Sequence, residues 1–545
     1  MIPKILLTIL LLTAGAAAQQ NLPPGSRNKP ERLEWFRDLG FGLFIHWSVD
    51  SQTGVVISHS LAGADEAYTS RFFHDLPKTF HPRKFYPQDW ASLARLAGIR
   101  YVVFTTKHHS GFTMWDTRTN DFGIMHTPFP RDLTREILEA FRAQGIHAGI
   151  YFSPDDFWWL WKNRIDVQRN IPAVQPRNNP GLMKLDLDQM RELMTGYGRI
   201  DFVFLDGDPY QLRDLAWELQ PDTVVTRGAI QTPELYVPGV PLEGAWETCF
   251  TMGTAWQYQP QNENYKSGGQ VIDLLVETRA KGGNLLLNIG PKPDGELPIE
   301  QEERLREVAL WMQVNQECIY GVRPWAITNE QNIWFTRAKN ENTVYAIVKQ
   351  QPRWVRGQWR DFVLKSVRAT EKTRLSVLGQ NGRVLEYRPE VDPRPTFRQE
   401  ADGLHLRAMF THRLQDNSRW PNPIVLKITN VEAAFTPPKV ETTGARYDAA
   451  TRTAELRGTL LDMGKTDSLE VGFEYRNIVG LDASDRSIPW QMGPSTTRSA
   501  PGPFALSLPN LNPEAIYEYR AWVKHPLLTI AGAEKRMESG VRPRP

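Results

Sequence analysis

Between Trp35 and about Tyr320, short apolar runs alternate with amphipathic stretches. Each apolar run leads into a turn and ends near a polar or ionisable residue, as in YVVFTTKHH at 101–109. The stretches between the runs carry apolar residues at helical spacing. A repeated order of helix then strand at this length predicts parallel strands joined by crossover helices. The predicted strands cover 42–47, 101–109, 147–153, 201–209, 223–228, 245–249 and 284–290, and the predicted helices cover 88–98, 131–145, 186–198, 211–221, 269–283 and 299–316.

The number of strands favours an α/β fold of the (β/α)8-like barrel type for residues 19–324. At least seven strands are predicted, and the interval between residues 42 and 101 leaves room for an eighth. The helix at 299–316 is expected to close the barrel. An open doubly wound sheet is the alternative, although no Gly-rich phosphate turn of the dinucleotide type follows the first strand.

After Tyr320 the pattern changes to apolar–polar alternation broken by turn residues. Runs at 333–348, 373–380 and 422–431 predict an antiparallel β-sandwich domain over 325–434. The Pro pair in FTPPKVE is typical of a linker, and it precedes a second C-terminal β module over 435–545. LNPEAIYEYRAWVK in this module resembles the late strands of fibronectin III-like domains.

The first residues contain one basic side chain, Lys4, followed by a short apolar run and three alanines that end at Ala18. This order is typical of a signal peptide over 1–18, cleaved near Ala18. The apolar run is too short to span a bilayer, and no run of about 20 apolar residues occurs later. The sequence therefore predicts an exported protein, periplasmic or secreted, without a membrane anchor.

Composition adds three constraints on partners and chemistry. The 64 basic and 62 acidic residues give a formal charge of +2, so no nucleic-acid partner is predicted. The two cysteines, Cys249 and Cys318, cannot form a disulfide framework and are expected to be buried free thiols. The 18 tryptophans are compatible with sugar binding or with core packing. Oligomeric state is left open.

Polar residues stand where the predicted strands end. The carboxyl ends of parallel strands meet at one edge of a barrel or sheet, which is where active sites form. The side chains expected there together are His46, His108, Tyr151, Asp206, Arg227 and Glu247. Asp206 alone could simply start a turn. Together with the other polar residues at this edge, it indicates acid–base or nucleophilic chemistry on a polar substrate.

Metal ligation is the alternative for His46, His108 and His109. Zinc and non-haem iron sites usually add a carboxylate or Cys at recognisable spacing. No H-x-x-x-H or H-x-D pattern accompanies these histidines. Hydrogen bonding to substrate hydroxyls is therefore favoured, and neither a metal nor an organic cofactor is expected.

Six motifs together resemble the α-L-fucosidases of glycoside hydrolase family 29, in order and with similar spacing from Trp35 to about Pro324. They are FGLFIHWSVDS (41–51), FTTKHHSGFTMWDT (104–117), GIYFSPDD (149–156), FLDG (204–207), TPE…WETC…AWQY (232–258) and KGGNLLLNIGPKPDGEL (281–297). As a set these motifs are highly specific to the family.

The resemblance implies a retaining exo-α-L-fucosidase that acts on a fucosylated oligosaccharide or glycoconjugate. It also implies a role for most residues at the predicted edge. Asp206 matches the family's nucleophile and Arg227 its basic residue near the catalytic pair. Other residues match sugar-binding positions: His46, His108, His109 and Tyr151 for fucose hydroxyls, Trp256 for the C5 methyl group, and Phe204 for the pocket wall.

Two carboxylates compete for the general acid/base. In the family this residue lies on a variable loop before the W-E strand, which favours Glu234; Glu247, deeper on that strand, is the runner-up and could instead bind a hydroxyl. Glu243 is the third option, as a solvated loop residue. Arg227 is expected to keep Asp206 ionised, while a less polar setting keeps Glu234 protonated.

The chain departs from the family pattern on one side of the expected pocket. Ser110 follows the His pair where the family usually has Asp, and Val56 and His59 stand where Trp and Glu are common. Trp158, Trp159 and Trp161 could pack in the core or form a platform for the leaving group. The Pro-rich stretch 169–184 predicts a long loop at the edge of the site.

Three other functions remain compatible with the sequence. A related glycosidase could act on an α-L-galactoside, which differs from a fucoside by one hydroxyl at C6, because an apolar pocket rejects an added hydroxyl only weakly. A non-catalytic fucose-binding protein is a second possibility, motivated by Ser110 and the Val56–His59 region. The terminal module could also bind glycan, although it shows no clear sugar-contact motif.

Overall fold

The computed structural model describes residues 25–261, 263–349, 353–385, 388–411, 422–478, 489–513, 515–526 and 528–537. The predicted signal peptide lies outside these residues. Within them, no helix is both long enough and apolar enough to cross a membrane. Cys249 and Cys318 are free and buried, as predicted.

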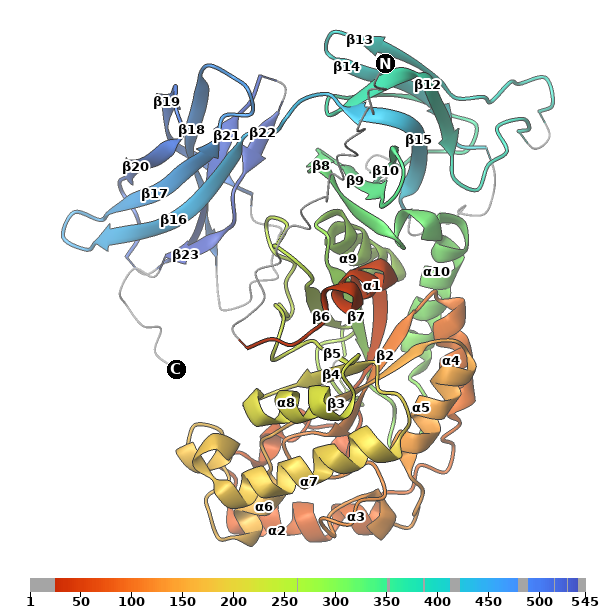
Figure 1. The fold of residues 1–545 in the computed structure, drawn as a ribbon, viewed down its shortest axis with the longest axis vertical. Helices are drawn as coiled ribbons and strands as arrows, with labels where there is room; N and C mark the ends of the chain where they lie inside the picture. Colours follow the sequence, from red (N-terminus) through yellow and green to blue (C-terminus); the bar gives the residue numbers. More distant parts are fainter. Residues whose placement is uncertain are drawn as a thin grey trace, which may run out of the picture.

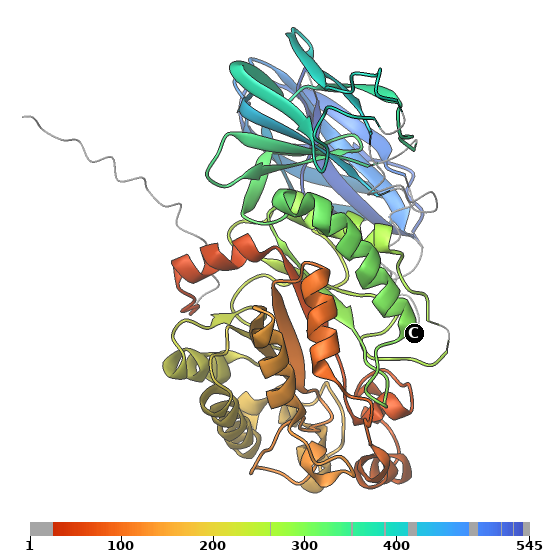
Figure 2. The same ribbon diagram turned by 90° about the vertical axis from the view of Figure 1, so that its right-hand side faces the viewer.

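The N-terminal half is built on a curled parallel sheet in the order β5-β4-β3-β2-β1-β7-β6, covered by helices (Figures 1 and 2). This confirms the predicted fold class. The strands are β1 (Phe41–Ile45), β2 (Tyr101–Lys107), β3 (His147–Phe152), β4 (Phe202–Leu205), β5 (Val224–Val225), β6 (Glu247–Thr251) and β7 (Asn284–Ile289).

The predicted position of an eighth strand is wrong. The interval after β1 holds short helices instead: η1 (Val49–Gln52), η2 (His59–Leu61), α2 (Glu66–His74), α3 (Leu76–Thr79) and α4 (Pro87–Leu96). The place beside β6 is taken by an irregular segment, where Gln231 and Glu234 form parallel bridges to Trp246 and Cys249. This segment follows β5 and extends the curl toward closure.

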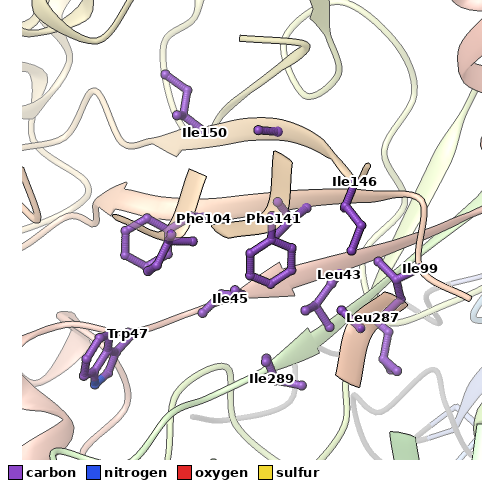
Figure 3. Close-up of a cluster of buried hydrophobic side chains, with 14 of the residues drawn as sticks. Leu43, Ile45, Trp47, Ile99, Phe104, Phe141, Ile146, Ile150, Leu287 and Ile289 are labelled. Carbon is purple, nitrogen blue, oxygen red and sulfur yellow. The ribbon is translucent and has the colours of Figure 1, made fainter. Parts of the chain in front are cut away.

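Side chains on both faces of the sheet are buried, because the strands alternate between two apolar layers. Leu43, Ile45 and Trp47 point to the helix layer, with Phe104 and Phe141 nearby (Figure 3). The opposite set forms a separate core inside the curl, closed by α1 (Pro30–Leu39): Leu33, Phe36, Phe44, Tyr101, Tyr151, Phe202 and Phe204. Phe44 belongs to the inner set, so alternation directs His46 inward as well.

The crossover helices agree with the predicted ones to within a few residues, except that α7 starts earlier and α6 was not predicted. They are α5 (Leu133–Ala143), α6 (Phe157–Lys162), α7 (Pro180–Gly196), α8 (Tyr210–Leu219), α9 (Gly268–Ala280) and α10 (Ile299–Asn315). Asp132 caps α5 by accepting from the Arg135 backbone, and Ser267 with Gln270 forms a capping box on α9. Local capping therefore agrees with the tertiary arrangement.

The C-terminal half consists of antiparallel sheets with two further cores. The first pair of sheets contains β8 (Val322–Glu330), β9 (Ile333–Ala338), β10 (Thr343–Val348), β12 (Val367–Val377) and β15 (Ile424–Ala433), facing β11 (Trp359–Leu364), β13 (Thr396–Glu400) and β14 (Gly403–Met409). The expected boundary at 324 falls inside β8. The Trp311 indole on α10 donates to the Pro423 carbonyl over 2.9 Å and ties this part to the helix layer.

The last part has two sheets around its own core. They are β16 (Lys439–Asp448), β17 (Thr453–Asp462) and β20 (Gly502–Leu508), and β18 (Leu469–Ile478), β19 (Gln491–Arg498), β21 (Ile516–Lys524), β22 (Thr529–Ala531) and β23 (Lys535–Met537). In Figure 1 these strands stand apart from the curled sheet, beside the first C-terminal sheets.

Candidate active site

Polar side chains gather at the carboxyl ends of β1 to β5, as the sequence predicts. His46 follows β1, His108 and His109 follow β2, Asp206 follows β4, and Arg227 follows β5. Tyr151 is the penultimate residue of β3 and faces the same interior. Side chains from five consecutive parallel strands thus meet at one end of the curled sheet.

Asp206 is bonded directly to two other side chains of this group. Its carboxylate accepts a hydrogen bond from the Tyr151 hydroxyl at 2.8 Å and one from Arg227 Nη1 at 3.0 Å. His109 Nε2 lies 3.6 Å away. Burial alone would raise the pKa of Asp206, but His109, Arg227 and Tyr151 outweigh it and lower the pKa below its usual value. Asp206 is therefore held as the carboxylate.

The other end of the Arg227 guanidinium contacts Glu234, with 2.8 Å between Nη2 and Oε2. One guanidinium thus bridges two carboxylates from different segments. The Glu234 side chain is 41% exposed. The expected less polar setting for Glu234 is therefore wrong, because the carboxylate is half in solvent and paired with a cation.

Glu234 stands at a tight turn in the segment beside β6. The Cys249 backbone N–H donates to the Pro233 carbonyl, and the Leu235 N–H donates to the Cys249 carbonyl. Leu235 has φ of 60°, which a side-chain-bearing residue rarely adopts. These contacts fix the backbone of Glu234 while its side chain extends to the mouth of the site.

Three histidines line the site and are supported in the same way. His46 Nδ1 lies 2.6 Å from the Asn288 side-chain oxygen, His108 Nδ1 lies 2.9 Å from the Ser58 hydroxyl, and His109 Nδ1 lies 2.6 Å from the Ser153 hydroxyl. Burial lowers the pKa of His46 to about 4 and that of His109 to about 3, and it also lowers the pKa of His108. These imidazoles are neutral near pH 7, and each keeps Nε2 for a ligand.

Aromatic rings complete the wall. Tyr151 stacks on His108 with centroids 5.4 Å apart, and on Phe204 with centroids 5.6 Å apart. The Trp256 ring lies 5.0 Å from that of His46. Arg227 lies over the Phe204 ring at 4.6 Å. The structure therefore brings Trp256 and Phe204 to the same site as the polar residues.

Glu247 was expected at the same edge, but it lies apart from this group because it is the first residue of β6 and not the last. It is fully buried at the start of β6, and the Tyr101 hydroxyl donates to it over 2.6 Å. It precedes Cys249 by two residues on the same face of β6, and the Cys249 sulfur is itself 4.0 Å from Arg227. Glu247 thus occupies a deeper layer of the curl, where burial raises its pKa to about 7.

Sequence reasoning missed two residues that border the site beside His59, namely Asp155 and Arg169. Asp155 is buried, lies 3.7 Å from His109 Nδ1, and has a pKa raised to about 7 by burial. Arg169 and His59 come from two loops and lie 3.5 Å apart. The SPDD stretch after β3 was a signal for Asp155, whereas loop residues such as Arg169 carry no periodic signal.

Ser110, which departs from the family pattern, has a structural role. Its backbone N–H donates to the Ser58 hydroxyl at 2.9 Å, the same hydroxyl that supports His108. Ser58 has φ of 59°, and its own N–H donates to the buried Asp50. The turn after β2 is thereby joined to the loop after β1.

A fully buried ion triad lies directly behind the histidine pair. Lys107 Nζ is 3.2 Å from Asp156 and 2.8 Å from Asp186, and all three side chains are inaccessible to solvent. Asp156 also caps α6 by accepting from the Trp159 backbone. The triad ties β2 to α6 and α7 at the residue before His108.

The tryptophan cluster packs in the interior. Trp158 is 8% exposed and stacks on Phe122 and Trp161, with centroids 5.1 Å and 5.4 Å away. Trp161 also contacts Phe73 on α2. Core packing therefore accounts for Trp158 and Trp161. The predicted loop at 169–184 contains η4 (Pro172–Val174), η5 (Pro176–Asn178) and the first turn of α7.

Within the described residues, the ligand atoms of His108, His109 and Asp206 lie within 4.8 Å of one another. Two neutral imidazoles and a carboxylate are chemically able to ligate a divalent metal. The Asp206 carboxylate is already paired with Arg227, whose charge opposes a second cation. A second group, Glu400, Asp402 and His405, is largely exposed in the C-terminal half.

The comparisons with known proteins agree on one family. The sequence model described as Alpha-L-fucosidase matches residues 10–317. An alpha-L-fucosidase of Branchiostoma floridae is 30% identical over 420 residues, 68% of this chain and 90% of that protein. The plasma alpha-L-fucosidase of Rattus norvegicus is 30% identical over 397 residues, 65% of this chain and 84% of that protein.

Solved structures agree with the fold. The Thermotoga maritima alpha-fucosidase in complex with fucose has a TM-score of 0.58 and 25% identity, covering 74% of this chain and 97% of that chain. Alpha-L-fucosidase isoenzyme 1 from Paenibacillus thiaminolyticus has a TM-score of 0.57 and 24% identity, covering 74% of this chain and 99% of that chain.

Proposed function

The chain belongs to the α-L-fucosidase family, and on that premise we propose that it is a retaining exo-α-L-fucosidase that releases L-fucose from fucosylated oligosaccharides or glycoconjugates. One observation carries the proposal: Arg227 bridges Asp206, held as a carboxylate, and Glu234, which reaches the mouth of the site. A nucleophile and a proton donor on one guanidinium are a suitable pair for glycoside cleavage.

The proposed stereochemistry predicts the spacing of this pair. Retaining enzymes place the two carboxyl groups about 5–5.5 Å apart, whereas inverting enzymes leave about 6.5–9.5 Å for a water. The shared guanidinium brings both carboxylates to one site, with contacts of 3.0 Å and 2.8 Å. Retention with a covalent intermediate is proposed from the family membership and is tested by the anomer that is released first.

In the proposed first step, Asp206 attacks the anomeric carbon and forms a bond to the sugar, while Glu234 donates a proton to the departing oxygen. In the second step, Glu234 removes a proton from water, which attacks the same carbon and releases Asp206. The hydroxyl takes the position of the leaving group, so the α configuration is retained.

Glu234 must change its contacts during this cycle. Its Oε2 atom lies 2.8 Å from Arg227 Nη2, whereas a general acid has to reach the glycosidic oxygen. We therefore assign its contact with Arg227 to the state that accepts a proton. In the acid state Glu234 exchanges that contact for one with the glycosidic oxygen, which its exposed side chain is free to do.

The remaining residues of the site are assigned to sugar binding. His46, His108 and His109 each direct Nε2 away from a supported Nδ1, and neutral imidazoles are suited to sugar hydroxyls. Trp256 and Phe204 supply apolar faces for the C5 methyl group and the ring. Glu247, held by Tyr101 in a deeper layer, is assigned a structural role.

Export is part of the proposal. Several relatives are named plasma alpha-L-fucosidases, and the chain starts with a segment of signal-peptide type. Cleavage near Ala18 would leave intact α1 and the strands that carry the site, since α1 begins at Pro30.

Hydrolysis of 4-nitrophenyl α-L-fucoside tests the proposal. The wild-type protein is expected to release nitrophenol and, initially, the α anomer of L-fucose. Asp206→Ala is expected to abolish release, and azide is expected to restore turnover through the β-fucosyl azide. Asp222→Ala, which removes an exposed carboxylate, is the matched control.

Three results would contradict the proposal. Full activity of Asp206→Ala would show that Asp206 is not the nucleophile. Initial release of the β anomer would show that the enzyme inverts the configuration. Tight binding of fucose without turnover would indicate a binding protein. Faster hydrolysis of the corresponding α-L-galactoside would change the substrate class.

A further inference from the structure

A pair of basic side chains borders the site and has no role in the mechanism above. His59 is the first residue of η2, in the loop after β1, and Arg169 lies in the loop after α6. Arg169 Nη1 is 3.5 Å from His59 Nε2, and Arg169 Nε is 3.8 Å from the carboxylate of Asp155. The contacts connect three segments that are far apart in sequence.

We propose that His59 binds a ring hydroxyl of the sugar and that Arg169 is its positioning residue, which makes the pair a specificity determinant of this pocket. The inference rests on the proposed function, because it concerns how the same pocket recognises fucose.

His59 continues the wall formed by the other histidines. Its ring centroid lies 5.7 Å from that of His109 and 6.2 Å from that of His108. It stands edge-on to His109, at an interplanar angle of 77°. A ligand that contacts the Nε2 atoms of His108 and His109 is therefore expected to reach the neighbouring ring of His59.

The two catalytic carboxylates act on His59 electrostatically. Burial lowers the pKa of His59, and Arg169 lowers it further, but Asp206 and Glu234 both act in the opposite direction. His59 therefore shares the electrostatic environment of the catalytic pair.

Arg169 determines which nitrogen of His59 carries the proton. A guanidinium only donates hydrogen bonds, so the Nε2 atom next to it has to be the unprotonated acceptor. The proton of the neutral ring is then on Nδ1, which is able to donate to a hydroxyl oxygen. This is the opposite arrangement to His46, His108 and His109, which use Nδ1 for support.

The backbone on both sides of the pair is anchored. The His59 N–H donates to the carbonyls of Val56 and Ile57, and the preceding Ser58 is held by Asp50. The Gly63 N–H donates to the Val167 carbonyl over 2.9 Å, which joins the two loops directly. His59 is therefore presented by a fixed loop although its side chain is partly exposed.

The test compares His59→Ala, Arg169→Met and the double variant, with His126→Ala as a control because His126 is exposed on η3. Loss of one neutral hydrogen bond is expected to lower kcat/KM about tenfold in His59→Ala. The fall should be the same for 4-nitrophenyl α-L-fucoside and α-L-fucosyl fluoride, since the contact is with the sugar. The inhibition constant of free L-fucose should rise by a similar factor.

Deoxygenated substrates identify the hydroxyl. Three aryl α-L-fucosides, each lacking one ring hydroxyl, are assayed with wild type and His59→Ala. For one of them the His59 substitution should cost nothing further, because both partners of the same hydrogen bond are then absent. Arg169→Met should show the same substrate signature with a smaller loss, and the double variant should be no worse than His59→Ala. A structural role for Arg169 would not reproduce that signature.

Two results would overturn the inference. One is an unchanged inhibition constant for L-fucose in His59→Ala. The other is a loss of kcat/KM in His59→Ala that is the same for each of the three deoxygenated substrates as for the full substrate. Failure of the proposed function gives a different result, because the wild-type protein itself then does not hydrolyse the aryl fucoside. In that case calorimetry still compares the binding of L-fucose to wild type and to His59→Ala.

Discussion

Arg227 lies 3.0 Å from the carboxylate of Asp206 and donates a hydrogen bond to it from Nη1. The two residues follow adjacent parallel strands, β5 and β4, whose carboxyl ends lie side by side. The pairing therefore results from the topology of the sheet, and it places a permanent positive charge beside the proposed nucleophile.

Substitution of Arg227 by Met is expected to move the acidic limb of the pH–rate profile. Asp206 acts as the carboxylate, so kcat/KM falls as pH drops through its pKa, and Arg227 is one of the groups that lower that pKa. Without the guanidinium the pKa rises, and the limb should move up by about one to three pH units. Profiles of kcat/KM from pH 3 to 8 measure it. Arg135→Met, a change at an exposed helix residue, should leave the limb in place; an unmoved limb in Arg227→Met contradicts the assignment.

Glu234→Ala separates the two chemical steps. Loss of the general acid should lower kcat/KM by about 10²–10⁴ for an aryl fucoside with a poor leaving group, and much less for the 2,4-dinitrophenyl fucoside. With the activated substrate the second step becomes limiting, and azide should accelerate it. Glu243→Ala is the control, because Glu243 is an exposed residue of the same region. Equal losses for both leaving groups would remove Glu234 from this role.

Glu247→Gln should change stability rather than chemistry. Burial raises the pKa of Glu247 to about 7, so between its usual pKa and that value the folded state holds a proton that the unfolded state has lost. Wild-type stability therefore decreases as pH rises through this window, by about 3 kcal/mol at most. Gln does not titrate, so the variant should gain unfolding free energy relative to wild type between pH 4.5 and 7. Denaturant titrations measure this gain, and a difference independent of pH would contradict it. Azide, which rescues loss of the nucleophile or of the acid/base, should not affect the turnover of Glu247→Gln.

Lys107→Met should destabilise the fold by roughly 3–5 kcal/mol, because it leaves the buried side chains of Asp156 and Asp186 without their cation. Chemical denaturation measures the loss. Lys184→Met breaks a single exposed pair with Asp188 on α7 and should cost no more than about 1 kcal/mol. Equal effects of the two substitutions would show that burial of the triad contributes nothing.

The parts of the fold that the sequence predicted are those with regular periodicity. The long apolar runs of β1, β2, β3 and β7 are buried on both faces, so their pattern is unambiguous. The residues at their ends then follow from parallel topology, which is why His46, His108, Tyr151, Asp206 and Arg227 come together as predicted. The eighth strand was misplaced because the segment beside β6 contains Pro233 and has no apolar run to indicate it.

Other features depend on tertiary contacts that no local pattern encodes. His59, Asp155 and Arg169 come from three loops, and only the folded chain brings them to one border of the site. The setting of Glu234 was mispredicted for the same reason, since its pairing with Arg227 arises from a turn packed against β6. The tryptophans of α6 were ambiguous in sequence because α2, their packing partner, is distant along the chain.

The turn that carries Glu234 meets β6 through isolated bridges and a few backbone hydrogen bonds, outside the regular ladder of the sheet. Insertions or deletions there would leave the register of every regular strand untouched. The proton-transferring carboxylate can thus shift during evolution while the group that bonds to the sugar stays fixed on β4. Relatives of this chain would then diverge in the alcohols they release sooner than in the monosaccharide they recognise.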